Sequence, residues 1–502
     1  MSNAFSSRIG VTVEEGISNA VSLDSNISTR NIGLAVERER GLVGIPTLVT
    51  SPKEDKRLFG GHDPSMYSSY VVENLFNNAG GYPVNVYQSR VVGVGCVASS
   101  IAVMQGVTEA FKVRAGRAGV RDVGTWGNAL RFRIYPMGNA NGSGEGYLAE
   151  VVYKGYLVET FTSVGASLVN LAEQINQRSE FIMVEGTALS TVITTVFDGM
   201  LVGGVYVAPL EANFNPVYNA VTLEAEGIAV FDNVDVQIIA CPEIFSVNFA
   251  KACEAFAKSN LKLFIFVMPY LATEAVVETY YNALSTPDQS FTAGYLEWVE
   301  VMADNLGNKI WIPQTGYILG AGYIKKAGLN NGDVWTPPAG VDTNSKGIFR
   351  FTHQDLNDDR QSRFVKKWRC NVTKYIKNIG FCSWSSRTYS NNSLFESIHV
   401  RLETNWLVKS VETRNQPFMQ KIISPSLQKS ILSSNLIWFK NLYERGGIEQ
   451  SIDFSDAVII EIEVSKENRK EAEMTISWIP PECLEHMHIR FNRNDGVLIT
   501  NF

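Results

Sequence analysis

The chain has little of the chemistry that marks enzymes and metal proteins. Its 502 residues include only five histidines and six cysteines, and no two cysteines form a CxxC pair. The zinc and redox spacings that are built on CxxC are therefore absent. Scattered cysteines of this kind are typical of reduced thiols in a protein that folds in a cytoplasm. The six are Cys96, Cys241, Cys253, Cys370, Cys382 and Cys483.

Long apolar runs are also missing. A helix that spans a membrane needs about 18 or more consecutive apolar residues. The most apolar run here, residues 261–267, has only the length of a strand. The opening sequence MSNAFSSRIGVTVEEG has no apolar core of signal-peptide length. We therefore expect neither membrane insertion nor a secretion signal.

Local catalytic signatures are absent too: the sequence has no GxSxG, HExxH, Walker A or EF-hand pattern. Residues 93–98 (GVGCVA) resemble the GxGxxA of a dinucleotide site, but the SSIAVMQG that follows predicts a strand instead of the required helix. His486 and His488 share one face of a predicted strand without an evident third ligand, which favours exposed histidines over a metal site. We predict no catalytic, cofactor-binding or metal residues.

What is present is an ordinary composition with an uneven charge distribution. The chain is 45% hydrophobic and 19% charged, and its net charge is −7. Residues 205–349 hold 7 basic and 15 acidic side chains, whereas residues 350–445 hold 16 basic and 7 acidic ones. Either these are solvated faces, or an acidic face of one copy meets a basic face of the next. A basic cluster beside Trp368 is common on helix surfaces, so we expect no direct nucleic-acid contact.

The most distinctive stretch is 293–340, which is rich in aromatics, glycines and prolines but has no cysteine or histidine. We interpret it as a packed spine of the fold. Trp298, Trp311 and Trp335 are the expected anchors, and the glycines would permit close approach of neighbouring backbones. Whether any of these aromatics faces a neighbouring molecule is left open.

Periodicity predicts an α/β protein that carries a β-rich insertion. A strand at 32–36, a helix at 66–77 and a strand at 83–92 form a β-α-β start. Residues 93–204 alternate like antiparallel strands, and strands at 236–241 and 261–268 then alternate with helices as in a parallel α/β layer. Further predictions are helices at 364–376 and 416–442, a strand or helix start at 398–405, and strands at 458–464, 473–479 and 487–490.

The order of short motifs resembles that of contractile tail sheath proteins of phages and phage-tail-like injection systems. Residues 9–15 (IGVTVEE) resemble the PGVYVEE opening of that family, and residues 124–128 (GTWGN) resemble its G-x-WGN. Other collinear matches are residues 47–51 with 59–61 (TLVTS and FGG), 293–298 (AGYLEW), 312–316 (IPQTG), 335–340 (WTPPAG), 380–388 (GFCSWSSRT) and 398–402 (IHVRL). Three positions depart from the family pattern: Glu297 and Gln314 replace prolines, and Leu402 replaces an arginine.

The resemblance implies an α/β (α+β mixed) fold with extended, strand-forming arms at both ends. The implied parts are an N-terminal arm at 1–25, a core at 26–92 and 205–486, an outward-facing inserted β-rich domain at 93–204, and a C-terminal strand or arm at 487–502. The arms would exchange strands between subunits through Ile9, Val11 and Val13 at one end, and through Val497, Leu498 and Ile499 at the other.

The resemblance also implies the function. A sheath subunit is a homo-oligomer in stacked hexameric rings or helical strands around an inner tube protein, with baseplate and terminator or cap proteins at the ends. It is not an enzyme, needs no cofactor, is assembled in the bacterial cytoplasm, and contracts from a metastable extended state to drive the tube through a target envelope. The motifs fit a phage, a bacteriocin or an injection system equally. The alternatives are a non-contractile shell or secretion-assembly protein and, less favoured, a soluble carbohydrate-active enzyme.

Overall fold

The computed structural model describes residues 30–138, 144–164, 168–186, 189, 192–221, 223–285, 290–329, 334–355, 357–465 and 470–483. Contacts divide the chain between Lys409 and Ser410 into two compact units, which are taken in turn. Helices and strands occur in the described parts of both, so the predicted α+β mixture is confirmed.

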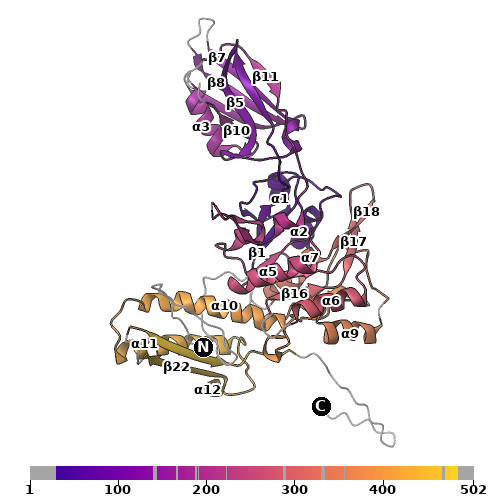
Figure 1. Ribbon diagram of the computed structural model, residues 1–502, viewed down its shortest axis with the longest axis vertical. Coiled ribbons are helices and arrows are strands. Elements are labelled where there is room, and N and C mark those ends of the chain that lie inside the picture. Colours follow the sequence, from indigo (N-terminus) through magenta and orange to yellow (C-terminus); the bar gives the residue numbers. More distant parts are fainter. Residues whose placement is uncertain are drawn as a thin grey trace, which may run out of the picture. The chain divides into compact units, whose positions relative to one another are not determined.

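A six-stranded sheet forms the centre of the first unit (Figure 1). Its strands run in the order β16-β15-β14-β1-β3-β2, all parallel except the edge strand β2. Sheets of this kind are covered on both faces, and their strands are therefore continuously apolar, as in the LFIFV of β15. The predicted parallel layer is confirmed. The strands are β1 (Asn31–Val36), β2 (Thr47–Val49), β3 (Asn85–Arg90), β14 (Ile238–Ala240), β15 (Leu263–Val267) and β16 (Thr292–Tyr295).

The helices that connect these strands begin at clear capping residues. The Ser51 side chain accepts a hydrogen bond from Glu54 N at the start of α1, and Ser246 accepts one from Phe249 N at the start of α5. Each cap satisfies a backbone N–H that the first helical turn leaves without a partner. The helices are α1 (Pro52–Phe59), α2 (Tyr67–Asn78), α5 (Val247–Ser259) and α6 (Glu274–Leu284).

A buried helical segment within the aromatic, glycine-rich stretch was not predicted from the sequence. It consists of α7 (Thr315–Tyr317), the π-helix η3 (Ile318–Lys325) and α8 (Lys326–Leu329). A Cβ atom on Gly316 would lie 2.1 Å from the carbonyl oxygen of Val71 in α2, and one on Gly320 would lie 2.3 Å from that of Leu75. The two helical backbones therefore touch only because these positions are glycine.

The inserted β-rich region has its own hydrophobic core. Two four-stranded sheets pack with α3, and Figure 1 shows this group in purple and magenta. The chain enters and leaves through a two-stranded neck, in which Gly93 N donates to Val207 O at 2.9 Å and Val97 N to Val205 O at 3.0 Å. The elements are β4 (Ser100–Gln105), β5 (Thr108–Arg117), β6 (Val120–Arg121), η1 (Thr125–Ala129), β7 (Leu130–Gly138), β8 (Gly144–Tyr153), β9 (Tyr156–Val164), α3 (Leu168–Arg178), β10 (Ile182–Glu185) and β11 (Phe197–Met200).

The last part of the first unit corrects one prediction and settles another. The helix predicted at 364–376 is wrong in its second half, because Arg369 adopts a left-handed conformation (φ 53°) that ends α9. Residues 398–405, which the sequence predicts as either a strand or the start of a helix, form the start of helix α10. Elements here are α4 (Glu211–Phe214), β12 (Val217–Tyr218), β13 (Ala225–Glu226), η2 (Gly227–Phe231), β17 (Trp298–Met302), β18 (Lys309–Pro313), η4 (Val341–Thr343), β19 (Arg350–Phe351), α9 (Asp358–Trp368), β20 (Thr373–Ile376), β21 (Gly380–Ser383), η5 (Ser393–Phe395) and α10 (Ile398–Asn415).

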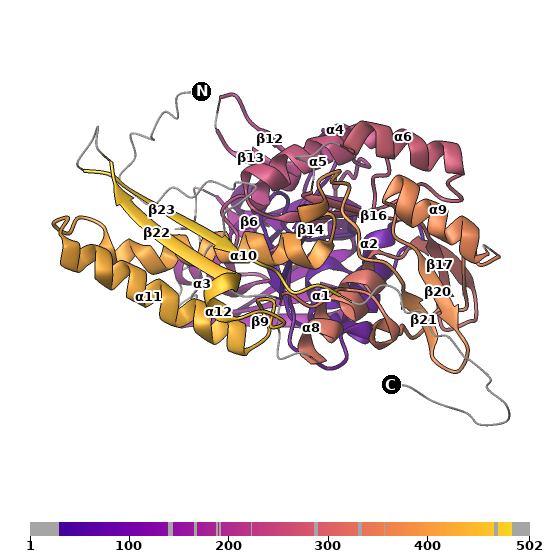
Figure 2. The ribbon, with the colours of Figure 1, turned by 90° about the horizontal axis from the view of Figure 1, so that it is seen from below.

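The second unit pairs helices with a long hairpin. β22 and β23 pair in antiparallel register from Val458 opposite Trp478 to Val464 opposite Ala472, and Figure 2 shows them running beside α11. The single helical tract predicted at 416–442 is wrong, because Met419 is extended and α11 restarts with Pro425 at its first turn. The elements are η6 (Gln416–Phe418), α11 (Pro425–Glu444), α12 (Phe454–Ala457), β22 (Val458–Val464) and β23 (Ala472–Trp478).

Candidate functional site

The residues predicted to exchange strands lie outside the described residues. Their role therefore stays a prediction. They are Ile9, Val11 and Val13 in the N-terminal arm, and Val497, Leu498 and Ile499 in the C-terminal arm.

The three predicted tryptophan anchors differ in their surroundings. Trp298 is 4% exposed, and its indole N–H donates to Met268 O at 2.8 Å. Trp335 is 8% exposed and packs against Trp406, with ring centroids 6.0 Å apart. Trp311 is only half-buried. The ring centroid of Tyr270 lies 5.4 Å from that of Trp298 and 5.7 Å from that of Trp311. These two tryptophans therefore belong to one aromatic group, and Trp335 belongs to another.

The two positions where glutamate and glutamine replace the family's prolines form one buried network. Gln314 Nε2 donates to Glu297 Oε2 at 3.1 Å, and Thr373 Oγ1 donates to Gln314 Oε1 at 2.7 Å. Thr373 N also donates to Glu297 Oε2 at 3.1 Å. Glu297 is 1% exposed, and this burial raises its pKa to about 8, so the carboxyl is largely protonated at pH 7. The side chains at the two departing positions are thus hydrogen-bonded to each other, which the sequence pattern alone did not reveal.

The carboxyl ends of β1 and β14 lie where open α/β sheets commonly bind ligands, because the strand order reverses there. Glu243 follows β14 and accepts a hydrogen bond from Ser68 N at 2.8 Å and another from the Ser68 hydroxyl. Its carboxyl thus lies at the N-terminal end of α2, the position that suits an anion. Burial raises the pKa of Glu243 to about 7 and also raises that of Glu37, which follows β1. The protein's own side chain occupies the ligand position.

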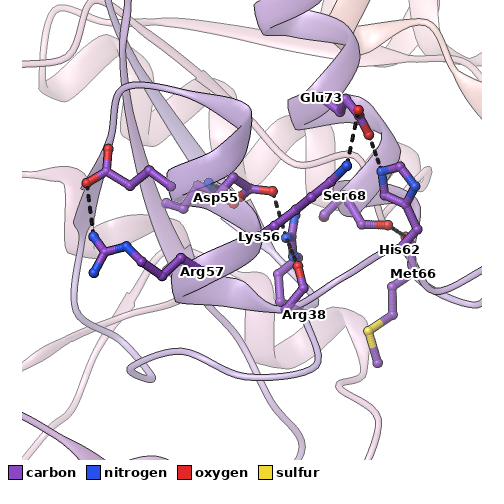
Figure 3. A network of polar contacts seen from close by, with 12 residues as sticks. Arg38, Asp55, Lys56, Arg57, His62, Met66, Ser68 and Glu73 are labelled. Atoms are coloured by element: carbon purple, nitrogen blue, oxygen red, sulfur yellow. Dashed lines mark hydrogen bonds and ion pairs between the residues drawn. The ribbon is translucent and has the colours of Figure 1, made fainter. Parts of the chain in front are cut away.

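A polar network fixes α1 and α2 to the sheet (Figure 3). Arg38 Nη2 donates to Asp55 Oδ2 at 2.8 Å, and Gln88 Nε2 donates to the other oxygen of that carboxylate at 2.8 Å. Figure 3 also shows Glu73 of α2 between His62 and Lys56. The hydrogen bond from His62 lowers the pKa of Glu73 to about 2 against the opposing effect of burial. These contacts are structural, since each links neighbouring elements of the core.

Buried cations fasten the inserted region to the core. Arg90, at the end of β3, is 0% exposed and donates to Asp122 Oδ1 at 2.9 Å and to Val123 O at 2.8 Å. Asp122 also accepts a hydrogen bond from Gly41 N at 2.8 Å. Arg40 places its guanidinium 4.4 Å from the ring centroid of Phe181. Pulling the two regions apart would leave buried charges without partners, so the inserted region is held firmly.

Part of the uneven charge is paired within the chain. Arg360 and Arg363 of α9 approach Glu274 of α6 at 3.4 and 3.6 Å, and Lys367 approaches Glu278 at 3.4 Å. Acidic and basic blocks therefore meet inside one subunit at this place. Exposed pairs of this kind contribute about 0–1 kcal/mol each.

The hairpin of β22 and β23 is an incomplete sheet. Within the described chain β22 pairs only with β23, so its other edge has no strand beside it. On one face Ile460 and Ile462 are half-buried, whereas Ile459, Glu461 and Glu463 on the other face are exposed. An isolated hairpin is marginally stable, and a free edge is a template for another strand. This edge is therefore a candidate site for strand addition.

The histidine, cysteine and acidic side chains of the described residues form no group of three that would hold a metal ion. No helix among them is long and apolar enough to cross a membrane.

Comparison with known proteins rests on structure alone. No family model matches the sequence, and no curated protein matches it. The sheath tail protein of Listeria innocua superimposes with a TM-score of 0.63 at 12% identity, over 92% of this chain and 94% of that one. The sheath complex of PVC, an extracellular contractile injection system, superimposes in its contracted state with a TM-score of 0.55 at 14% identity, over 98% of this chain and 99% of that one. The contracted helical sheath of the anti-feeding prophage superimposes with a TM-score of 0.54 at 14% identity, over 97% of this chain and 100% of that one. The chain has the fold of the contractile tail sheath proteins, as its motifs predict.

Proposed function

We propose that this protein is a structural sheath subunit that polymerises around an inner tube. The observation that carries the proposal is the incomplete β22–β23 hairpin in a chain with the sheath fold. A subunit that leaves a sheet unfinished is completed by a strand from another molecule. The subunits would form stacked hexameric rings or helical strands, with baseplate and cap proteins at the two ends.

The terminal arms are the proposed source of the added strands. Residues 9–13 and 497–499 are strand-forming in sequence and would join neighbouring copies through main-chain hydrogen bonds. Such bonds tie subunits together without fixing the distance between their cores. A lattice joined in this way can shorten while its subunits stay connected.

Contraction requires a rigid body that moves and links that flex. The buried Arg90–Asp122 pair supports a body made of the core and the inserted region together. Energy for driving the tube through a target envelope would be stored when the subunits assemble in a metastable extended state. The sheath needs no catalytic residues or cofactor for this work. We place assembly in the bacterial cytoplasm and the finished sheath on a phage tail or a related released particle.

The test is negative-stain microscopy of the purified chain and of a variant that lacks residues 2–16. We expect hollow tubes or stacked rings from the full chain, and a folded protein that no longer polymerises from the variant. A chain that stays monomeric under all conditions would contradict the sheath role. Particles with a single, unchanging lattice would instead favour a non-contractile shell.

A further inference from the structure

Two stretches of the chain carry charge of one sign only. Residues 179–250 contain nine acidic residues and no lysine or arginine, whereas residues 360–395 contain eight basic residues and no acidic one. Among the described residues, Glu180, Glu185 and Asp198 of the first stretch pair with arginines between positions 57 and 133. The cations of the second stretch pair with acids between positions 274 and 396. Salt bridges within the described subunit therefore do not join the two stretches to each other.

The acidic stretch contains the β12–β13 hairpin, whose tip is apolar. Val221 is 90% exposed and Leu223 is 77% exposed, and the neighbouring Glu224 and Glu226 are exposed as well. Leu223 has a φ of 60°, a conformation that a bulky residue rarely adopts. Exposed apolar side chains on a strained turn are typical of a contact surface. These four residues are called the acidic tip.

The basic stretch contains the β20–β21 hairpin, whose tip combines apolar and cationic side chains. Tyr375 is 58% exposed and Ile379 is 41% exposed, and Lys377 between them is exposed too. Lys346 adds a second exposed cation, because the residue before it forms a β-bridge with β21. Tyr375 is held in place by Phe381, with ring centroids 5.2 Å apart. Tyr375, Lys377, Ile379 and Lys346 are called the basic tip, and they complement the acidic tip in charge.

The two tips lie apart in one subunit. Figure 2 shows β12 and β13 on one side of the first unit and β20 and β21 on another. A contact between the tips would therefore join two copies. Because the two surfaces differ, each copy in such a contact still offers one tip to a further copy. A contact of this heterologous kind builds rings or filaments instead of a closed pair.

We propose that the acidic tip of one copy docks on the basic tip of another. The apolar side chains meet at the centre and the opposite charges meet around them, as is usual in protein interfaces. The inference rests on the proposed function, in which copies form rings or helical strands. It adds a contact between folded cores that internal hairpins make, separate from the terminal arms. Two hairpin tips bury little surface, so the contact gains strength from repetition through the lattice.

Charge reversal in the full-length protein tests the docking. The variants are E224K/E226K, K346E/K377E, and a chain with all four changes. Each double variant should raise the protein concentration needed for tube formation about three- to ten-fold, because attraction between exposed charges becomes repulsion. The fourfold variant should assemble near the wild-type concentration, since the charges are complementary again. Light scattering and negative-stain microscopy measure this, and circular dichroism checks folding.

Leu223→Gly separates docking from folding. Glycine adopts the left-handed conformation without strain, which offsets the added freedom of the unfolded chain, so the variant should melt close to the wild-type temperature. It lacks the exposed apolar side chain and should still need more protein to assemble. A lower melting temperature with unchanged assembly would show that Leu223 serves the fold and not the contact.

A control separates the reversal effect from net charge. E109K/E173K reverses two exposed glutamates of the inserted region and should assemble as the wild type does. Normal assembly of both double variants would overturn the contact but leave the sheath role intact. Failure of the fourfold variant to recover, with its fold retained, would also overturn it.

Cross-linking reads the contact without relying on tube formation. Chains carrying L223C and chains carrying I379C are mixed and oxidised at high concentration. More disulfide-linked dimer in the mixture than in either chain alone is the expected result, and equal amounts would contradict the contact. A wild-type chain that forms neither rings nor tubes would instead contradict the proposed function.

Discussion

Strand β1 of the central sheet and strand β22 of the hairpin differ in how their two sides are paired. β1 has β14 on one side and β3 on the other, and every residue of β1 is buried. β22 pairs on one side only within the described chain, and only Val458 among its residues is fully buried. β1 thus finds both of its neighbours within one subunit, whereas we propose that β22 takes its second neighbour from another. Substitutions in the first should lower subunit stability, and changes to the partners of the second should affect assembly.

The largest effect on stability is expected at the Arg90–Asp122 pair. Arg90→Ala leaves the Asp122 carboxylate buried without its cation, which should cost about 3–5 kcal/mol in the free energy of unfolding. The double variant R90A/D122A should lose less unfolding free energy than the two single variants lose in sum, because it leaves neither charge of the pair buried without its partner. Denaturant unfolding measures all three. Strict additivity would show that the pair does not act as one unit.

Gly316→Ala should have the next largest effect. The added methyl group would meet the carbonyl oxygen of Val71, so α2 and α7 must separate, at about 1–3 kcal/mol or more. Gly61→Ala is the matched control, because nothing lies within 4 Å of its Cβ position. Equal melting temperatures for the two variants would contradict the close contact of the helical backbones.

Glu297→Gln should change the pH dependence of stability by a smaller amount. The folded-state pKa of about 8 exceeds the unfolded value, so wild-type stability should fall as pH rises from about 4.5 to 8 and then level off. The variant has no such carboxyl, so its stability should not fall for this reason. Between pH 5 and pH 8.5 its unfolding free energy should therefore rise by about 1–3 kcal/mol relative to that of the wild type. Unfolding curves at both pH values measure it. Parallel pH profiles would show that the carboxyl is ionised in the folded protein.

The smallest effect on subunit stability should come from deleting residues 484–502. The hairpin keeps all seven of its residue pairs, so the unfolding free energy should change by less than about 1 kcal/mol. Assembly should nevertheless be lost. A large fall in subunit stability would mean that the segment completes its own subunit instead of a neighbour.

Periodicity predicted the elements that have one buried face or a continuous apolar run. It failed for α7 and η3, because a helix that is buried on nearly all sides shows no polar face, and because its glycines are interpreted as breaks. It also extended α9 beyond Trp368, since nothing in the sequence signals a left-handed Arg369.

The candidate site was predicted in part. Alternation in β22 and β23 was readable from the sequence, but the unpaired edge depends on which strands meet in space. The network of Glu297, Gln314 and Thr373 joins residues far apart in the chain, and no local pattern announces it.

The central claim is that a second molecule completes the hairpin. Electron cryomicroscopy of assembled tubes, at a resolution that shows main-chain hydrogen bonds, tests it most directly. The account predicts a strand from another copy bonded along β22. A β22 edge that faces solvent, or that pairs with its own chain, would contradict it.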